Sequence, residues 1–368
     1  MLHNIRRCIR YKRPGTITGT LLIGTLCILF TLVTIITVNA PITTISQLKL
    51  RMYGTEIACF RYHNMKTLPD INDENPPTNS IFFHETSCKS SQSGRIILNP
   101  RQACAVESAA LLHPHRQVYI LFTSPGELKP GAGDSSDLAI NALLTYTNIR
   151  LGHLDFTKYV NNTPLEHIYS SGALELSQYA GSHASDVLRY LTLWKHGGVY
   201  LDLDVIITKQ LDDLGENYAG SESDTNVAAG VLGFAADGDG HQWARDCLDD
   251  LSTGFSGHEW GRNGPGVITR LLRKLCGVQK AIDMNKSSCH GFKVLPPSAF
   301  YPIPWWNWTM YFNKKYSDVT IQLVRDSYAI HVWNKHSNKR KLVPEAAYAR
   351  VARIHCPKVY NALKGLSF

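Results

Sequence analysis

The clearest pattern of apolar and polar positions runs from residue 182 to 207. Apolar side chains recur with helical spacing across 187–194, and a basic last turn leads into Gly197-Gly198. Both features predict a helix that ends at the glycines. A short apolar strand at 199–201 follows and leads into two aspartates. The pattern thus predicts a helix, a glycine turn and a strand that ends in paired acids.

Strand-like apolar runs alternate with helix-like segments elsewhere in the chain. Residues 81–84 and 118–122 are typical of buried strands, and residues 98–110 of a helix. This alternation favours an α/β fold with a mostly parallel sheet and helices on both faces. No G-x-G-x-x-G or Walker sequence occurs, which argues against a dinucleotide-binding fold and a P-loop ATPase. Further helices are expected at 241–251 and 265–275.

Two later segments each allow two interpretations. The small apolar residues at 227–234 either let a sugar approach the backbone at their glycines or form a tightly packed core strand. Residues 300–305 contain two prolines and several aromatic side chains, which predicts a rigid loop. That loop either lines a binding groove or closes the core.

The N-terminal region has the pattern of a membrane anchor. No charged residue occurs from 14 to 48, and residues 17–38 would span roughly 33 Å as a helix, enough to cross a bilayer. The alternative is a cleaved signal peptide ending near 38–40, although its apolar part would be unusually long. We expect a cytosolic tail at 1–13, a single transmembrane signal anchor at 14–39, a stem at 40–78 and a body from 79 onward.

Composition and charge narrow the class. The chain has 368 residues, 44% of them hydrophobic and 18% charged, so it can bury a large core. The net charge of +8 is misleading, because the first 13 residues carry five basic side chains and no acid. The remainder has only a small basic excess and no interleaved basic and aromatic patch, which argues against nucleic acid as a partner.

The paired acids are the main candidate for chemistry. Asp202 and Asp204 are two apart and would point the same way if the strand stays regular. Crowded carboxylates suit Mn²⁺ or Mg²⁺, and a cation would keep both ionised. The alternative is a solvated strand end. A second Asp-x-Asp at 237–239 lies among glycines, which predicts a surface turn.

The preceding helix adds a polar face of its own. Asp186, Arg189 and Tyr190 are three and four residues apart, on a face different from the apolar stripe. Asp186 and Arg189 are either functional or a simple ion pair on the helix surface.

The phrase S-D-x-L-R…G-G-x-Y-L-D-x-D across 185–204 resembles the α1,4-galactosyltransferase and α1,4-N-acetylglucosaminyltransferase family. Three further segments resemble segments of the same family: W-G-x-x-G-P at 260–265, F-Y-P-I-P-W at 300–305 and A-x-H-V-W-N-K at 329–335. The resemblance implies a type A, Rossmann-like glycosyltransferase fold. It also implies a nucleotide-sugar-binding region at 79–215 and an acceptor-binding region at 216–368.

The resemblance also implies roles for individual residues. His331 would join the two aspartates as a metal ligand, unless it is a core histidine. Trp260 would stack on an acceptor sugar, unless it is a core tryptophan. We therefore expect catalytic roles for Asp186, Arg189, Asp202 and Asp204, donor binding by Ser185, Asp186, Arg189, Gly198, Tyr200 and Asp202, and acceptor binding by Trp260, Asn263, Gly264 and Pro265.

The expected reaction transfers galactose from UDP-galactose, with retention and a metal ion, to a glycolipid such as lactosylceramide. Family membership would place the enzyme in the Golgi membrane as a single-pass type II protein. UDP-N-acetylgalactosamine and UDP-N-acetylglucosamine are alternative donors, because small pocket changes separate them. A mannosyltransferase and an inactive, membrane-anchored carbohydrate-binding protein are further alternatives.

Cysteines and sequons fit a lumenal body. Two of nine cysteines fall in the predicted tail and anchor, and the other seven suggest three disulfides and one leftover. Short loops favour Cys88–Cys104 and Cys276–Cys289, with Cys247–Cys356 as the third pair, and Cys59 is then free to link a homodimer. Predicted N-glycosylation sites are Asn161, Asn285 and Asn307.

Overall fold

The computed structural model describes residues 56–129 and 133–363, which lie within one compact unit. The predicted tail, the predicted anchor and the first part of the predicted stem lie outside the described residues. Among the described residues, none of the helices has the length and apolar character needed to span a bilayer.

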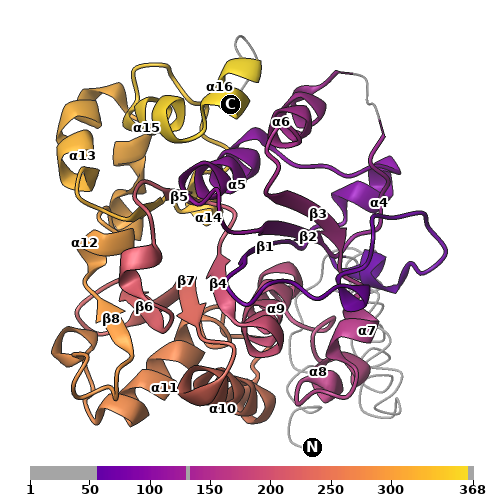
Figure 1. Ribbon diagram of the computed structural model, residues 1–368, viewed down its shortest axis with the longest axis vertical. Coiled ribbons are helices and arrows are strands. Elements are labelled where there is room, and N and C mark those ends of the chain that lie inside the picture. Colours follow the sequence, from indigo (N-terminus) through magenta and orange to yellow (C-terminus); the bar gives the residue numbers. More distant parts are fainter. Residues whose placement is uncertain (1–55, 130–132, 364–368) are drawn as a thin grey trace, which may run out of the picture. The chain divides into compact units, whose positions relative to one another are not determined.

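A seven-stranded sheet organises the body, in the order β3-β2-β1-β4-β7-β6-β8 (Figure 1). The first four strands pair in parallel, β7 is antiparallel to both of its neighbours, and β6 and β8 are parallel. The expected α/β class with a mostly parallel sheet is confirmed. The strands are β1 (Ile81–Glu85), β2 (Val118–Phe122), β3 (Ile149–His153), β4 (Gly198–Leu201), β6 (Tyr218–Ser221), β7 (Val227–Phe234) and β8 (Lys293–Leu295).

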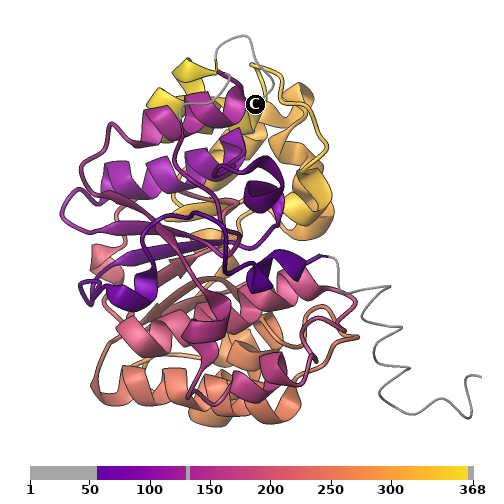
Figure 2. The same cartoon turned by 90° about the vertical axis from the view of Figure 1, so that its right-hand side faces the viewer.

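Alternate side chains of the buried strands face two different cores. Ile81 and Phe83 of β1 lie in one apolar cluster, and Phe82 between them lies in the other. Helices α5 (Pro100–Leu112), α6 (Ser135–Leu143), α15 (Ala347–His355) and α16 (Pro357–Ala362) contribute to the first cluster. Helices α7 (Phe156–Val160), α8 (Glu166–Ser170), α9 (Ala180–His196), α10 (Gly238–Gly254) and α11 (Pro265–Cys276) contribute to the second. Helices therefore cover both faces of the sheet, as both views show (Figures 1 and 2).

A separate two-stranded sheet joins distant parts of the chain. Strand β5 (Val205–Ile207) pairs antiparallel with β9 (Ala329–His331), and Val205 lies opposite His331. This pairing brings the late histidine beside the acids. The remaining elements are α4 (Lys89–Ser93), α12 (Pro297–Phe300), α13 (Ser317–Val324), α14 (Asn334–Ser337), η1 (Ala58–Arg61), η2 (Ile71–Asp73), η3 (Asp212–Leu214), η4 (Ala281–Asp283), η5 (Trp305–Tyr311) and η6 (Lys314–Tyr316).

The glycine turn after α9 has a steric reason. Gly197 and Gly198 both have positive φ, and a Cβ on Gly198 would lie 2.3 Å from the Ser80 carbonyl oxygen. Gly198 lies at the start of β4, the end opposite the acids. Close backbone packing accounts for a glycine at this position, and its donor-binding role stays a prediction.

Part of the predicted stem belongs to the body. Ile57, Phe60 and Ile71 are buried, and the Phe60 ring stacks on Phe156 of α7 at 5.1 Å between centroids. The prediction that all of 40–78 is a spacer is therefore wrong for residues 56–78, because their buried apolar side chains pack into the two cores of the body.

The disulfide count is as predicted, but the pairing differs. Cys276–Cys289 is confirmed, whereas the predicted Cys88–Cys104 and Cys247–Cys356 pairs are wrong. The short-loop rule failed because α5 packs against the C-terminal helices, while 56–61 packs near α4. Cys59 is used within the chain, which corrects its expected role in a homodimer. The observed bridges are Cys59–Cys88, Cys104–Cys356 and Cys276–Cys289, and Cys247 is free and buried.

Candidate active site

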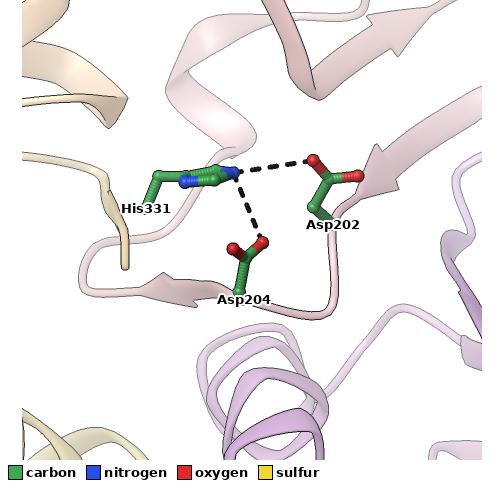
Figure 3. Close-up of side chains that lie close together, drawn as sticks. All are labelled: Asp202, Asp204 and His331. Carbon is green, nitrogen blue, oxygen red and sulfur yellow. Dashed lines mark ion pairs between the residues drawn. The ribbon is translucent and has the colours of Figure 1, made fainter. Parts of the chain in front are cut away.

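Asp202, Asp204 and His331 converge at one point (Figure 3). His331 Nε2 lies 3.3 Å from Asp204 Oδ1 and 3.6 Å from Asp202 Oδ2. The two acids do not lie on a regular strand as predicted. They occupy a turn between β4 and β5, in which the Val205 amide donates to the Asp202 carbonyl at 3.0 Å. This turn and the β5–β9 pairing bring the three side chains together.

The donor set fits a divalent cation. Two carboxylates and an imidazole offer ligand atoms that all lie within 4.8 Å of one another. Gly230 of β7 leaves the space for them, because a Cβ there would lie 2.9 Å from Asp202 Oδ2 and 3.1 Å from His331 Cδ2. The Asn334 amide donates to Asp204 Oδ2 at 2.7 Å and fixes that carboxylate. These residues would hold a metal between the two sheets.

Helix α9 supplies a buried ion network. Arg189 lies 3.0 Å from Asp186 Oδ1 and 3.1 Å from Asp202 Oδ1, and it donates to the Ala229 carbonyl at 2.6 Å. Asp186 and Arg189 are both buried. The alternative of a helix-surface ion pair is therefore wrong. Arg189 instead connects α9 to the acid turn and to β7.

Tyr200 orients Asp202 from the same side. Its hydroxyl donates to Asp202 Oδ1 at 2.7 Å and lies 3.0 Å from Ser185 Oγ. The Arg189 guanidinium lies 4.7 Å from the centre of the Tyr200 ring. Tyr200 and Ser185 thus belong to the support of the acids, in addition to their expected place near the donor.

Burial and neighbouring charges shift the pKa values of the site's acids in different directions. Burial raises the pKa of Asp186 to about 7, although Arg189 opposes the change. Burial would also raise the pKa of Asp202, but Arg189, with His331 and Tyr200, lowers it to about 2. Burial raises the pKa of Asp204. For His331, burial would lower the pKa, yet Asp204 and Asp202 raise it.

The triad opens into a cavity of about 1330 Å³. This volume exceeds the usual range for one drug-sized ligand, so two substrates can be accommodated. Ser185, Asp186 and Arg189 line it together with the triad, and so do Trp260 and Pro265. Trp260 is 41% exposed, and the Lys335 ammonium lies 3.6 Å from its ring centre. The alternative of a core tryptophan is therefore wrong.

Asn263 and Gly264, expected to contact the acceptor, both have structural roles in the loop. The buried Asn263 amide group bonds both the amide and the carbonyl of Ser256. A Cβ on Gly264 would lie 2.2 Å from Asp186 Oδ1. The Gly264 carbonyl accepts a hydrogen bond from the Tyr190 hydroxyl at 2.6 Å. Of the W-G-x-x-G-P loop, only the first and last residues, Trp260 and Pro265, line the cavity, and acceptor contact by Asn263 and Gly264 stays a prediction.

Several cavity residues were not predicted. His84 and Glu85 end β1, next to β4 in the sheet, and both line the cavity. Burial lowers the pKa of His84 to about 3, and its Nδ1 lacks a hydrogen-bond partner. A sequence signal existed, because ligands bind at the carboxyl ends of parallel strands, but the sequence did not show that β1 lies beside β4. Glu222, Tyr301 and Lys335 also line the cavity, and no local sequence signal marked Glu222.

The remaining predicted surface features are consistent with the fold. Asp237-Gly238-Asp239 is exposed, although it begins α10 and is not a free turn. Asn161, Asn285 and Asn307 are exposed, and their glycosylation stays a prediction.

Comparison with known proteins adds independent findings. Residues 99–220 match the glycosyltransferase sugar-binding region containing the DXD motif, and residues 236–363 match the alpha 1,4-glycosyltransferase conserved region. Mouse lactosylceramide 4-alpha-galactosyltransferase is 35% identical over 77% of this chain and 76% of its own length. Human alpha-1,4-N-acetylglucosaminyltransferase is 26% identical over 71% and 75%, respectively. The solved galactosyltransferase LgtC shares 14% identity over 77% of this chain and 95% of its own, with a TM-score of 0.38.

Proposed function

Because the chain belongs to the α1,4-glycosyltransferase family and is therefore a hexosyltransferase, we propose that it transfers galactose from UDP-galactose to a glycolipid such as lactosylceramide. The new linkage is α1,4 and retains the donor configuration, and the step belongs to glycosphingolipid biosynthesis. The observation that supports this most is the convergence of Asp202, Asp204 and His331 beside the buried Asp186–Arg189 pair, in one cavity.

Different residues of the site would bind the metal ion and the donor sugar. Asp202, Asp204 and His331 would hold Mn²⁺ or Mg²⁺. A divalent cation bound there would neutralise the charge that develops on the leaving diphosphate. Asp186, Arg189 and Ser185 would bind and orient hydroxyls of the donor sugar from α9. Retention follows if the acceptor hydroxyl attacks the face from which the diphosphate leaves, with the leaving phosphate oxygen taking the proton.

We place the enzyme in the Golgi membrane as a single-pass type II protein with a lumenal body. The uncharged stretch at 17–38 supports the anchor, and three disulfides in the body support an oxidising compartment.

An N-acetylhexosamine donor is the second candidate, since a relative named for N-acetylglucosamine transfer matches 71% of the chain. An inactive carbohydrate-binding protein is less favoured, because a lost activity would not require three intact ligand side chains around Gly230.

The test is product formation by the purified full chain with UDP-galactose, UDP-N-acetylgalactosamine and UDP-N-acetylglucosamine, each offered with lactosylceramide and Mn²⁺. We expect a trihexosylceramide from UDP-galactose, with an α1,4 linkage by mass spectrometry and glycosidase digestion. A faster reaction with an N-acetylhexosamine donor would replace the proposed donor, and absence of both transfer and donor hydrolysis would contradict the enzyme.

A further inference from the structure

An exposed aromatic and basic surface borders the cavity mouth. Trp305 and Trp306 open η5 with 49% and 59% of their surface exposed, and their rings pack edge to face at 5.6 Å. The His336 ring stacks on Trp305 at 5.6 Å and joins this pair to the exposed segment after α14. We call the following set the tryptophan–lysine rim: Trp305, Trp306, Lys335, Lys339, Arg340 and Lys341.

In the part of the chain that the structure describes, acidic side chains do not pair with the cations of the rim. None of its four cationic side chains forms an ion pair with a carboxylate among the described residues. The sequence also contains no Asp or Glu from 301 to 317 or from 328 to 344. The rim therefore presents uncompensated cations beside exposed indoles.

The backbone under the rim is fixed. Arg101 of α5 donates to the Ser337 carbonyl at 2.8 Å and to the Arg340 carbonyl. The Trp333 indole donates to the Ile303 carbonyl at 2.7 Å, which ties the basic segment to the loop before η5. The cations and the tryptophans are thus held in one arrangement and do not lie on independent loops.

A sugar in the cavity does not account for the whole rim. Trp305, Lys335 and residues 339–341 lie at the cavity mouth, but Trp306, the more exposed indole, lies outside the cavity lining. The diphosphate of a bound UDP-sugar would attract the cations that line the cavity, but neither it nor a neutral glycan reaches an indole outside the lining. Trp306 beside these cations therefore fits an occupant that is extended, anionic and apolar at once.

We propose that the tryptophan–lysine rim seats the enzyme on the surface of the bilayer that carries its acceptor, at anionic headgroups. Indoles favour the membrane interface because one edge is polar and the rest is apolar. Lys and Arg beside them add attraction to negative headgroups. Because the rim borders the cavity mouth, a glycolipid head group would enter the site without leaving the bilayer. The inference rests on the proposed glycolipid acceptor.

The test compares one glycan in two forms. The full chain is reconstituted into vesicles and supplied with UDP-galactose and either lactosylceramide in the bilayer or free lactose in solution. Vesicles contain phosphatidylcholine alone or with phosphatidylserine. The variants are Trp306→Ser and the triple Lys339→Ser, Arg340→Ser, Lys341→Ser. Ile282→Ser is the matched control, because this side chain is 64% exposed outside the rim.

We expect both rim variants to lose about tenfold in kcat/KM for bilayer lactosylceramide, while turnover of free lactose by Trp306→Ser, which lies outside the cavity lining, stays within about twofold. Wild-type turnover of lactosylceramide rises with phosphatidylserine and falls at high salt, and the triple variant loses this response. Retention of full bilayer turnover overturns the proposal, and so does an equal loss on both acceptors, which indicates a role inside the cavity.

A second measurement does not depend on the reaction. Brominated phospholipids quench indoles at the bilayer interface, so quenching of the full chain should fall in Trp306→Ser and not in Ile282→Ser. If wild type glycosylates neither form of the acceptor, the proposed function fails while quenching still decides the rim. Unchanged quenching in Trp306→Ser, or binding of the rim to an acidic protein in place of lipid, overturns the proposal.

Discussion

Asp204 is held in place from two sides, by the Asn334 amide and by His331. Replacement of Asp204 by Asn keeps its size and one acceptor oxygen but removes the charge that a divalent ion needs. We expect transfer to fall at least about 100-fold with little change in thermal stability, since even indirect disturbance of metal ligands costs 10–100-fold.

The chain contains a matched control for this substitution. Asp239→Asn alters the other Asp-x-Asp, which is exposed at the start of α10, and should leave transfer unchanged. Initial rates with radiolabelled UDP-galactose measure both variants. Transfer by Asp204→Asn within tenfold of wild type would argue against a ligand role.

Asp186 gives a prediction about pH. Its pKa is about 7 in the folded protein and about 4 in an unfolded chain. Between these values the folded state binds more protons, so this group lowers the stability as pH rises from 4 to 7 and has no further effect above 7. Asp186→Asn mimics the protonated form. We expect the unfolding free energy of the variant, relative to wild type, to increase by roughly 2–4 kcal/mol from pH 5 to pH 8.

Urea unfolding of both proteins across this pH range measures the difference. A constant difference would mean that Arg189 keeps Asp186 ionised throughout. Asp239→Asn again serves as the control, because an exposed carboxylate should give no such trend.

At the scale of elements, β7 connects the sheet to the site. Gly230→Ala would place a methyl group 2.9 Å from Asp202 Oδ2 and 3.1 Å from the His331 ring. We expect kcat to fall at least about tenfold, because the ligand atoms are forced apart. Gly254→Ala is the matched control, since its nearest neighbour is 3.8 Å away and belongs to a flexible Arg262 side chain. Equal activity of the two variants would show that β7 does not shape the site.

The helix, glycine turn and strand around 180–201 could be predicted from sequence because their signals are local. The turn that presents Asp202 and Asp204 could not, because it depends on the pairing of Val205 with His331, far away in the chain. The antiparallel insertion of β7 beside β4 is also non-local. Apolar periodicity predicts that a segment is a strand but not which other strand it pairs with.

The same limit applies at the scale of the whole molecule. The residue types of the site were identified, and Asp186, Arg189, Asp202, Asp204 and His331 meet in one place. The disulfide partners could not be predicted from the sequence in the same way. Cys104 and Cys356, for example, are 252 residues apart, and only helix packing brings them together. His84 and Glu85 were missed for a related reason, since only the order of strands in the sheet places them beside the acids.

Ligand binding at the site should stabilise the whole molecule, because a ligand that binds only the folded state shifts the unfolding equilibrium. Mn²⁺ with UDP at about 100 times Kd should raise the unfolding free energy by roughly 2.7 kcal/mol, and EDTA should abolish the effect. His331→Ala removes one of the three proposed ligands and should reduce the effect at the same concentrations, whereas His258→Ala alters an exposed histidine and should not. Differential scanning fluorimetry of the three proteins provides the measurement. If UDP alone stabilises the protein and Mn²⁺ does not increase the effect, the nucleotide binds in the cavity without a metal. That result would contradict the proposal that Asp202, Asp204 and His331 hold a cation.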